Sequence, residues 1–289
     1  MQNPPQHFGI LCHPKKPESG PLAERMQEFL EARGCTAWIG SAWDEPEAFA
    51  HIKDLDILIA LGGDGTMLRA ARIGGRDATP LVGVKLGLVS FLAEIAPEDW
   101  ERPLEQILSG QFWLEERMLL DVAVTRAGQP PVNHSYLAIN DVVISRGGLA
   151  RIVTVKTWVD QSYLTTYRAD GVIVSTPTGC TGYALAAGGP ILPPELKNIL
   201  VIPICPHLSL DRPIVLAQGA TVGLEAYGDY APILTVDGQF EIALTEGDRV
   251  EVRASRHVSH FVHVQDRAYF YRTLMDRLRW RGAGEGERR

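Results

Sequence analysis

The chain has 289 residues, 45% of them hydrophobic, and its 28 Lys and Arg against 35 Asp and Glu give a formal net charge of −7. This length and composition predict a globular protein of one or two domains, with a core large enough to fold without disulfide or metal staples. The acidic balance and the lack of a long Lys/Arg run speak against a nucleic-acid partner, and the apolar runs are far shorter than the roughly 20 residues that span a membrane. The four cysteines include no Cys-x-x-Cys pair, so a reducing, cytoplasmic setting is expected.

The first part of the chain alternates short apolar runs with amphipathic segments. The apolar runs predict strands at 8–12, 36–39, 56–61 and 81–84, and helical spacing predicts helices at 21–33, 66–73 and 97–108. Strands that alternate with helices favour a parallel sheet covered by helices. We therefore expect a Rossmann-like α/β domain at 1–112.

From about residue 113 the sequence becomes rich in Val, Ile, Thr and Tyr, with turn residues at intervals. It predicts strands at 121–125, 139–145, 151–159, 171–175, 199–203, 214–217, 221–226, 233–236 and 249–254. This pattern predicts a mostly β domain of the sandwich type at 113–266, interrupted by a short helix at 181–187. Region 267–289 is expected to hold an amphipathic helix, at 268–280, that packs on the first domain, followed by a frayed tail.

The segment Gly62-Gly63-Asp64-Gly65-Thr66 stands between a buried strand and a helix expected to start at Thr66. Ligands of open α/β sheets bind at the carboxyl ends of strands, where glycines let a phosphate approach the backbone and the helix N-terminus favours its charge. A carboxylate repels phosphate, so Asp64 fits a proton acceptor for an attacking hydroxyl, or an outer partner of a phosphate-bound Mg²⁺. The alternative is a plain Asp-Gly turn with Asp64 as the helix cap.

Two further segments carry polar groups suited to a nucleotide. The block from Arg168 to Pro190 joins a strand to a short helix through hydroxyl residues, proline and glycine, and Tyr183 offers a face to a base or a nicotinamide ring. A capped loop would show a similar composition. The pair Asn140-Asp141 could bond an adenine edge and a ribose hydroxyl, although a turn or a bulge also explains it.

The usual nucleotide signatures are missing. There is no Gly-x-x-x-x-Gly-Lys-[Ser/Thr], and the turn after the first strand lacks a Gly-x-Gly-x-x-Gly fingerprint. A dinucleotide would therefore not bind by the usual Rossmann turn.

The chain nevertheless resembles the bacterial ATP/polyphosphate-NAD kinase family over most of its length. The resemblance rests on motifs that occur in the family's order: Gly62-Gly63-Asp64-Gly65-Thr66, Asn140-Asp141, Asp170-Gly171 with Ser175-Thr176-Pro177-Thr178-Gly179, and Pro203-Ile204-Cys205-Pro206-His207. It implies an active site between an α/β domain and a β-rich domain, and a homo-oligomer, either a dimer or a tetramer. It also implies transfer of a phosphoryl group from ATP or polyphosphate, with Mg²⁺ or another divalent metal, to the 2′-hydroxyl of the NAD adenosine ribose.

The resemblance also implies roles for particular residues. Asp64 would be the general base, Asn140 and Asp141 would hold the adenosine, and Asp170 would reach the nicotinamide end. The phosphate donor would contact Gly62, Gly63, Gly65 and Thr66. Further NAD contacts would come from Asp64, Gly65, Arg69, Arg151, Arg168, Thr181, Gly182, Tyr183, Ala184, Leu185, Ala186 and Gln239. No metal ligand is assigned.

The sequence departs from the family pattern at three of these places. Asp141 stands where Glu is frequent, Cys180 where Ser is usual and Gly182 where Ala is usual. The Asp141 carboxylate is one methylene shorter, and the Cys180 thiol donates a weaker hydrogen bond than a hydroxyl would. These differences bear on contacts rather than on the reaction.

Other interpretations stay open at the level of sequence. The glycine motif also occurs in lipid kinases, so a diacylglycerol-type kinase is the main alternative enzyme, although the polar block at 170–190 favours a dinucleotide. A nucleotide sensor that dispenses with Asp64 is the non-catalytic alternative. His257, His260 and His263 could suggest a metal site, but on a strand His260 points away from the other two, so we expect edge-strand histidines near a domain surface.

Overall fold

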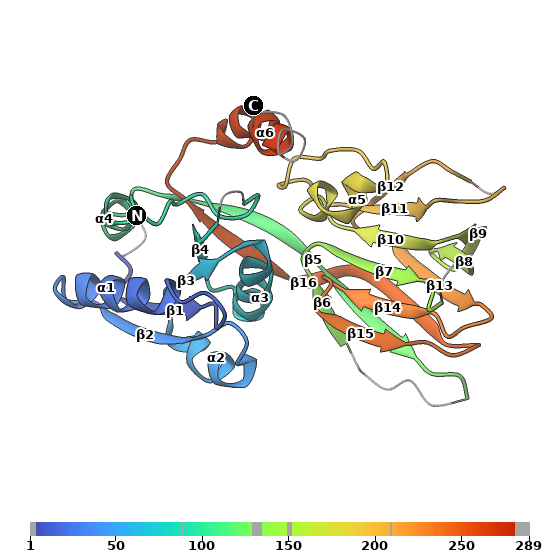
Figure 1. Ribbon diagram of the computed structural model, residues 1–289, viewed down its shortest axis with the longest axis horizontal. Helices are drawn as coiled ribbons and strands as arrows, with labels where there is room; N and C mark the ends of the chain where they lie inside the picture. Colours follow the sequence, from blue (N-terminus) through green and yellow to red (C-terminus); the bar gives the residue numbers. More distant parts are fainter. Residues whose placement is uncertain (1–3, 88–89, 129–134, 149–151, 209, 281–289) are drawn as a thin grey trace, which may run out of the picture. The chain divides into compact units, whose positions relative to one another are not determined.

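The computed structural model describes residues 4–87, 90–128, 135–148, 152–208 and 210–280 (Figure 1). The chain divides into two compact units: unit 1 comprises Met1–Glu116 and Ser259–Arg289, and unit 2 comprises Arg117–Val258. The chain passes from one unit to the other within two long strands, β5 (Trp113–Thr125) and β16 (Arg249–His263). Among the described residues, no helix is long and apolar enough to cross a membrane.

Unit 1 is built on a parallel sheet. Strands β2, β1, β3 and β4 lie side by side in that order, all parallel, and β16 joins β4 in parallel with Phe261 opposite Leu81. The other elements of this unit are β1 (His7–Cys12), α1 (Ser19–Glu31), β2 (Thr36–Ser41), α2 (Glu45–His51), η1 (Ile52–Asp54), β3 (Ile57–Gly62), α3 (Asp64–Gly75), β4 (Leu81–Lys85), α4 (Glu101–Leu108) and α6 (Tyr269–Trp280).

Helices cover both faces of this sheet, which explains the continuous apolar run of β3. Ile57, Ile59 and Leu61 pack in one buried cluster with residues of α1 and α4. Leu58 points to the opposite face, toward Gly74 of α3. Side chains alternate across a strand, so a strand covered on both faces buries every residue. The turn between β3 and α3 therefore lies at the carboxyl edge of a fully buried strand.

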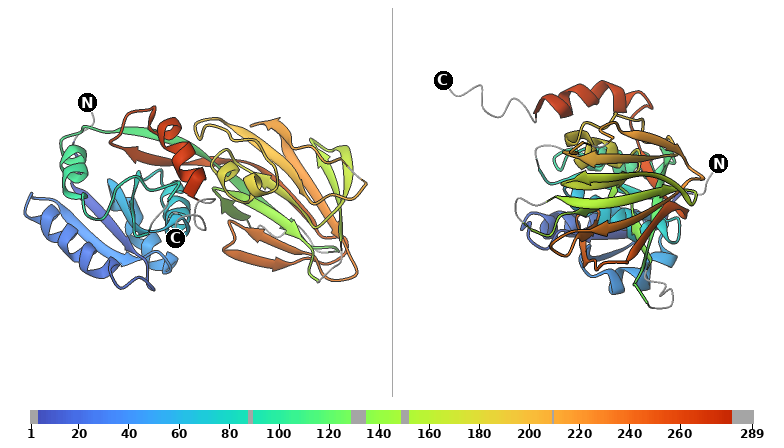
Figure 2. Two further views of the ribbon diagram at one scale, coloured as in Figure 1. Left: turned by 45° about the horizontal axis from the view of Figure 1, so that its top comes forward. Right: turned by 90° about the vertical axis from the view of Figure 1, so that its right-hand side faces the viewer.

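The last part of the chain returns to unit 1. After β16 the chain forms α6, drawn in red (Figure 2). Arg277 Nη1 on this helix donates to the Phe91 carbonyl at 3.1 Å, in the segment between β4 and α4. Both the helix predicted at 268–280 and its return to the first part of the chain are confirmed.

Unit 2 is a sandwich of antiparallel strands. One layer is a six-stranded sheet in the order β12-β11-β10-β7-β14-β15, and the other contains β16, β13, β8 and β9 in that order. The elements are β6 (Ser135–Ala138), β7 (Asp141–Ser145), β8 (Val153–Val159), β9 (Ser162–Ala169), β10 (Gly171–Ser175), η2 (Gly179–Thr181), α5 (Tyr183–Ala186), β11 (Asn198–Ile204), β12 (Ile214–Ala217), β13 (Thr221–Tyr227), β14 (Ile233–Val236) and β15 (Phe240–Ala243).

The core of unit 2 lies between its two layers. Val172 and Val174 of β10 point into it and pack in one buried cluster with residues of the opposite layer, such as Val155 and Leu224. Ile173, between them, points to the outer face of the six-stranded sheet, where Cys180 and Ala184 cover it. Helix α5, drawn in yellow, accordingly lies beside β10 and β11 (Figure 1). The predicted sandwich is thus present.

The remaining predicted elements overlap observed ones, with corrections at some ends. The helix predicted at 97–108 begins only at Glu101, so Pro103 lies in its first turn, where a missing N–H costs little. The helix predicted at 181–187 is two short pieces, η2 and α5, separated at Gly182. The sequence patterns missed five elements: α2, η1, β6, β9 and β15.

Candidate active site

The turn after β3 places Asp64 at the start of a helix. The chain passes from Gly62, the last residue of β3, through Gly63 directly into α3, whose first residue is Asp64. Gly63 is the N-cap, with extended backbone, and no side chain caps the helix. The predicted start at Thr66 is therefore wrong by two residues, and the alternative of Asp64 as the cap is wrong as well. A first-turn carboxylate is favoured by the positive end of the helix.

The Asp64 carboxylate is held by the segment that follows β4. Ser90 Oγ donates to Asp64 Oδ1 at 2.5 Å, and the amides of Phe91 and Leu92 donate to the same oxygen at 3.1 and 3.3 Å. The side chain is only half-buried. A partly exposed carboxylate in a defined orientation, beside a helix N-terminus, is suited to accept a proton from a bound hydroxyl.

The glycines of this turn serve different purposes. A Cβ at Gly62 would lie 2.1 Å from Thr66 Oγ1, and Thr66 is 1% exposed, so the turn closes only with glycine there. A Cβ at Gly63 or Gly65 would meet nothing within 4 Å. The space beside these two residues lets a ligand approach the backbone of the helix N-terminus, as phosphate binding requires.

In unit 2, Asp237 fixes the backbone of the Asn140-Asp141 pair. Asp237 lies in the turn after β14, with φ +51°, and its carboxylate accepts the amides of Ile139 at 3.0 Å, Asn140 at 2.8 Å and Asp141 at 3.1 Å. Three charge-assisted hydrogen bonds hold this stretch in one conformation. The pair lies at a bend between β6 and β7, as the turn alternative allowed, and Asp237 fixes that bend.

The side chain of Asp141 is buried close to this second carboxylate. Burial raises the pKa of Asp141 to about 7, and the neighbouring charge of Asp237 adds to the shift. Loss of hydration disfavours the charged form of an acid, and a nearby negative charge acts in the same direction. Asp141 therefore titrates near neutral pH and can donate as well as accept a hydrogen bond.

In the polar block at 168–190, the residues that end and follow β10 pack directly on Asn140. Ser175 Oγ and the Thr176 amide both donate to the Asn140 carbonyl, at 3.0 and 2.9 Å. A Cβ at Gly179 would lie 2.2 Å from that same oxygen, so only glycine fits there. A Cβ at Gly182 would lie 3.8 Å from Asn140 Nδ2 and 4.0 Å from an Asp141 carboxylate oxygen. The fold thus brings together two motifs that are some 40 residues apart in the sequence.

Asp170 and Tyr183 lie near each other on the same unit. Arg146 Nη1 is 3.2 Å from Asp170 Oδ1, and both side chains are about one-third exposed. Tyr183 is 48% exposed. Partial burial, and then the charge of Asp170, raise the pKa of Tyr183. An exposed aromatic ring beside an Asp–Arg pair is suited to hold the ring and the amide of a nicotinamide.

Two other residues of the block have structural contacts. Cys180, which stands where the family usually has Ser, is buried, and its sulfur donates to the Leu192 carbonyl at 3.4 Å and accepts the Leu192 amide at 3.1 Å. Ala184 packs beside Cys180 in the cluster that covers β10 and β11. The Cys180 thiol therefore holds a neighbouring loop, and Ala184 could meet a ligand only through its backbone. Thr181 is buried, Leu185 is half-buried and Ala186 is exposed.

The other predicted contacts are more scattered. Arg69, on α3, lies over the Trp43 ring at 4.7 Å, with Nη1 3.6 Å from Glu45 Oε1. Arg168 is exposed on β9. Gln239 is half-buried, and its backbone N–H donates to the Val236 carbonyl. Arg151 lies outside the described residues. Arg69 therefore meets aromatic and acidic neighbours of unit 1.

Sequence reasoning missed the partners of the predicted residues. Ser90, Phe91 and Leu92 follow the fourth strand of a parallel sheet. Their position at the carboxyl edge of that sheet, where ligands bind, could have marked them as site residues. Asp237 stands in an Asp-Gly turn before Gln239, a position typical of a turn rather than of a carboxylate with three backbone donors. Nothing in the sequence pointed to Arg146.

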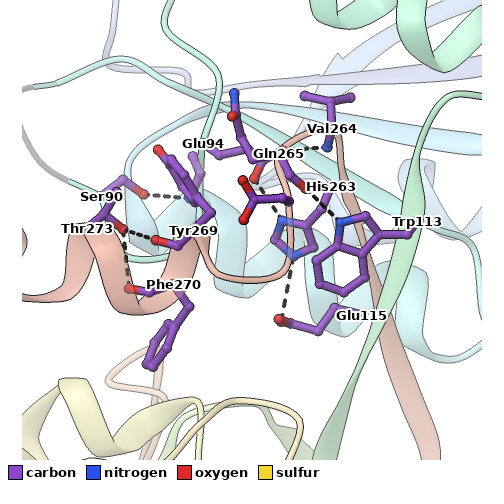
Figure 3. Close-up of polar contacts among 12 residues, drawn as sticks. Ser90, Glu94, Trp113, Glu115, His263, Val264, Gln265, Tyr269, Phe270 and Thr273 are labelled. Carbon is purple, nitrogen blue, oxygen red and sulfur yellow. Dashed lines mark hydrogen bonds and ion pairs between the residues drawn. The ribbon is translucent and has the colours of Figure 1, made fainter.

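The three histidines near the end of β16 do not form a cluster. His263 lies between two carboxylates: its Nδ1 is 2.8 Å from Glu94 Oε2 and its Nε2 is 3.7 Å from Glu115 Oε1, while Trp113 stacks on its ring (Figure 3). Its side chain is 14% exposed, so an edge position near the surface is wrong for His263. His260 Nε2 instead lies 3.8 Å from Glu116, and no group of side chains suited to a metal ion occurs in the part of the chain described.

Comparison with known families identifies both parts of the chain. The family model described as "ATP-NAD kinase N-terminal domain" matches residues 44–112. The model described as "ATP-NAD kinase C-terminal domain" matches residues 139–264. These ranges include the β3–α3 turn in the first match, and the Asn140-Asp141 pair with the block after β10 in the second.

Relatives extend the match to nearly the whole chain. A NAD kinase of Citrifermentans bemidjiense is 40% identical over 94% of this chain and 98% of its own, and one of Chloroflexus aggregans is 42% identical over 95% of this chain and 99% of its own. Two solved structures, each 24% identical, share the fold: a yeast NADH kinase complexed with NADH, with a TM-score of 0.79 over 100% of this chain and 90% of that one, and an NAD kinase from Archaeoglobus fulgidus in complex with ATP, with a TM-score of 0.75 over 95% and 99%. The chain therefore belongs to the NAD kinase family of enzymes.

Proposed function

We propose that this enzyme transfers the γ-phosphoryl group of ATP to the 2′-hydroxyl of the NAD adenosine ribose, with Asp64 as the general base. The observation that carries the proposal is the half-buried Asp64 carboxylate in the first turn of α3, held in one orientation beside glycines that leave the backbone accessible. The positive end of the helix favours the donor phosphates. The carboxylate supplies a group that can take a proton.

The chemistry follows from that arrangement. The ribose oxygen attacks the γ-phosphorus, the bond from that phosphorus to the bridging oxygen of ADP breaks, and the hydroxyl proton passes to Asp64. Phosphoryl transfer depends mainly on positioning and on electrostatic stabilisation of the phosphate oxygens. The backbone amides at the start of α3 would provide part of that stabilisation, and the base removes the proton as the new bond forms.

A divalent metal fits this site as a partner of the donor rather than as a protein-bound ion. The described residues hold no group of three metal-ligating side chains, and Asp64 is one carboxylate whose Oδ1 already accepts three hydrogen bonds. Mg²⁺ keeps several waters and binds through phosphates with only one or two carboxylates. Asp64 would be its outer partner, and the ion would neutralise phosphate charge.

Residues of unit 2 would hold the dinucleotide. Asn140 and Asp141, with their backbone fixed by Asp237, would bind the adenosine, and Asp170 with Tyr183 would bind the nicotinamide end. Gly182, Thr181, Leu185 and Ala186 would line this site, and Arg168, Gln239 and Arg151 would supply further polar contacts. Arg69 of unit 1 would add one more.

The decisive experiment compares Asp64→Asn with the wild-type protein in ATP, Mg²⁺ and NAD. Loss of a general base typically slows turnover by about 10²–10⁴-fold, and Asn keeps the size of the side chain, so KM for NAD should change little. Asp77→Asn, an exposed carboxylate in the turn that follows α3, is the matched control. Asp64→Asn that retains most of its turnover would refute the assigned base, and a protein that phosphorylates diacylglycerol but not NAD would refute the substrate.

Asp170→Ala tests the dinucleotide site separately. We expect KM for NAD to rise about tenfold with a smaller effect on kcat, because a lost hydrogen bond to a charged group is typically worth about 1.5–3 kcal/mol. Glu246→Ala, in the exposed β15–β16 turn, is the control. An unchanged KM would remove Asp170 from the NAD site.

Three properties complete the proposal. Polyphosphate could replace ATP, which a donor comparison tests. The enzyme would work in the cytoplasm, consistent with its four free cysteines. It would assemble as a homo-oligomer, a dimer or a tetramer, which light scattering of the purified protein tests.

A further inference from the structure

The two oxygens of the Asp64 carboxylate accept different numbers of hydrogen bonds. Oδ1 accepts three donors from one turn: Ser90 Oγ at 2.5 Å, the Phe91 amide at 3.1 Å and the Leu92 amide at 3.3 Å. Among the described residues, Oδ2 is reached only by the Phe91 amide, at 3.3 Å. Oδ1 is thus anchored by three donors, whereas Oδ2 accepts a single, longer hydrogen bond.

The Ser90 hydroxyl is directed at Asp64 by its other hydrogen bonds. Its oxygen accepts the amides of Leu92 at 3.2 Å and Ala93 at 2.8 Å, and the residue is only 4% exposed. A hydroxyl has two lone pairs and a single hydrogen. With both lone pairs facing amides, the hydrogen points to Asp64 Oδ1.

The turn that carries Ser90 is held at both sides by the end of the chain. Arg277 Nη1 of α6 donates to the Phe91 carbonyl at 3.1 Å. Glu94, 5% exposed, accepts the Val264 amide at 2.8 Å and lies 2.8 Å from His263 Nδ1 (Figure 3). Contacts on either side leave the segment little freedom to move away from Asp64.

We propose that Ser90 is a positioning residue for phosphoryl transfer: it anchors Oδ1 so that Oδ2 of Asp64 is the atom that takes the ribose proton. This inference rests on the proposed function. The 2′-hydroxyl proton passes to Oδ2 as the ribose oxygen forms its bond to the γ-phosphorus, while Oδ1 keeps its hydrogen bond from Ser90. A carboxylate fixed beforehand needs no reorientation at the moment of transfer.

The test compares Ser90→Ala with Ser90→Thr, which keeps the hydroxyl. We expect Ser90→Ala to lower kcat by roughly 10–100-fold, the scale of a misplaced catalytic group, with KM for NAD and for ATP within about threefold of the wild type. Ser90→Thr should recover most of the lost kcat. Ser109→Ala removes a hydroxyl that donates to the Glu105 carbonyl at the end of α4, and should leave kcat unchanged.

Ser90→Cys covers the case in which the alanine variant folds poorly, because it keeps the size of the side chain but donates a weaker hydrogen bond. It should turn over several-fold more slowly than wild type. The proposal is overturned if a folded Ser90→Ala or Ser90→Cys has the kcat of the wild type. It is also overturned if a folded Ser90→Thr is as slow as Ser90→Ala. If Asp64→Asn is inactive in the same assays, only the role proposed for Ser90 is refuted. If Asp64→Asn is active, the assignment of Asp64 as the general base is refuted as well.

Discussion

Asp141 is a carboxyl group whose surroundings favour its protonated form. Burial, and then the charge of Asp237, raise its pKa from 3.8 to about 7. Because the pKa is higher in the folded protein than in the unfolded chain, the stability that this group contributes is complete below pH 3.8. It is lost as the pH rises through about 7.

Asp141→Asn should remove this titration. Between pH 5 and pH 7.5 we expect the free energy of unfolding of the wild-type protein to fall by roughly 2 kcal/mol relative to that of the variant, since each pKa unit corresponds to about 1.4 kcal/mol. Urea unfolding of both proteins across this range measures the difference, with Asp77→Asn as the exposed control. A difference that does not change with pH would mean that Asp141 titrates with its ordinary pKa.

At the scale of single residues, the sequence indicated the candidate reactive and ligand-binding groups but not the residues that position them by hydrogen bonds. Asp64 stood out because three glycines surround it, and Asn140-Asp141 because two polar residues meet at a strand. Their partners, Ser90 and Asp237, lie 26 and 96 or more residues away along the chain. Hydrogen bonds over such separations depend on how strands are ordered in the sheets, which a local pattern does not contain.

The β3–α3 turn is an element whose glycines should respond in opposite ways to substitution. Gly62→Ala places a methyl 2.1 Å from Thr66 Oγ1, so strain should lower the free energy of unfolding by about 1–3 kcal/mol. Gly65→Ala meets nothing within 4 Å and lies in the first turn of α3. There the higher helix propensity of alanine should raise the free energy of unfolding by up to about 0.5 kcal/mol.

Chemical denaturation separates these two variants. The proposed donor site adds a second expectation, because the methyl of Gly65→Ala would occupy space that the phosphates approach, so KM for ATP should rise although the fold is no weaker. Gly62→Ala as stable as wild type would contradict the close contact with Thr66. Gly65→Ala with unchanged KM for ATP would take residue 65 out of the donor site.

The elements themselves were largely accessible from sequence because their patterns are local. Strand β3, buried on both faces, is a continuous apolar run, and α1 shows clear helical spacing. Strand β9 was missed because its burial is uneven, with Ser162 to Leu164 exposed, and α2 because it is short and buries only Ala48. The start of α3 was misplaced because glycine, rather than Ser, Thr or Asp, caps it.

At the scale of the whole molecule, unit 1 depends on contacts between distant parts of the chain. Glu94 follows β4, Glu115 lies in β5, and His263 ends β16, so the three side chains tie together segments that no local pattern connects (Figure 3). The two carboxylates are 5% and 8% exposed. Buried carboxylates need a compensating charge, which a protonated His263 supplies.

This arrangement makes the stability of unit 1 depend on pH. Burial by itself lowers the pKa of His263, but the Glu115 carboxylate, 3.7 Å from Nε2, and the Glu94 carboxylate, hydrogen-bonded at Nδ1, outweigh it, and the pKa is raised above 6.5. The stability gained from the protonated ring is therefore complete below pH 6.5 and is lost as the pH rises through the raised value. Above that value, Glu94 no longer faces a protonated ring.

His263→Gln should remove this loss, because glutamine can still donate a hydrogen bond to Glu94 but carries no charge at any pH. We expect the wild-type protein to lose more of its free energy of unfolding than the variant as the pH rises above 6.5. Asp141 titrates in both proteins, so the difference between them reports on His263 alone. Trp113, stacked on His263 at 4.7 Å, provides a local probe: its fluorescence should rise as the imidazolium loses its proton, and the rise should vanish in Trp113→Phe. Equal losses in wild type and His263→Gln would mean that the charge of the ring does not change over this range.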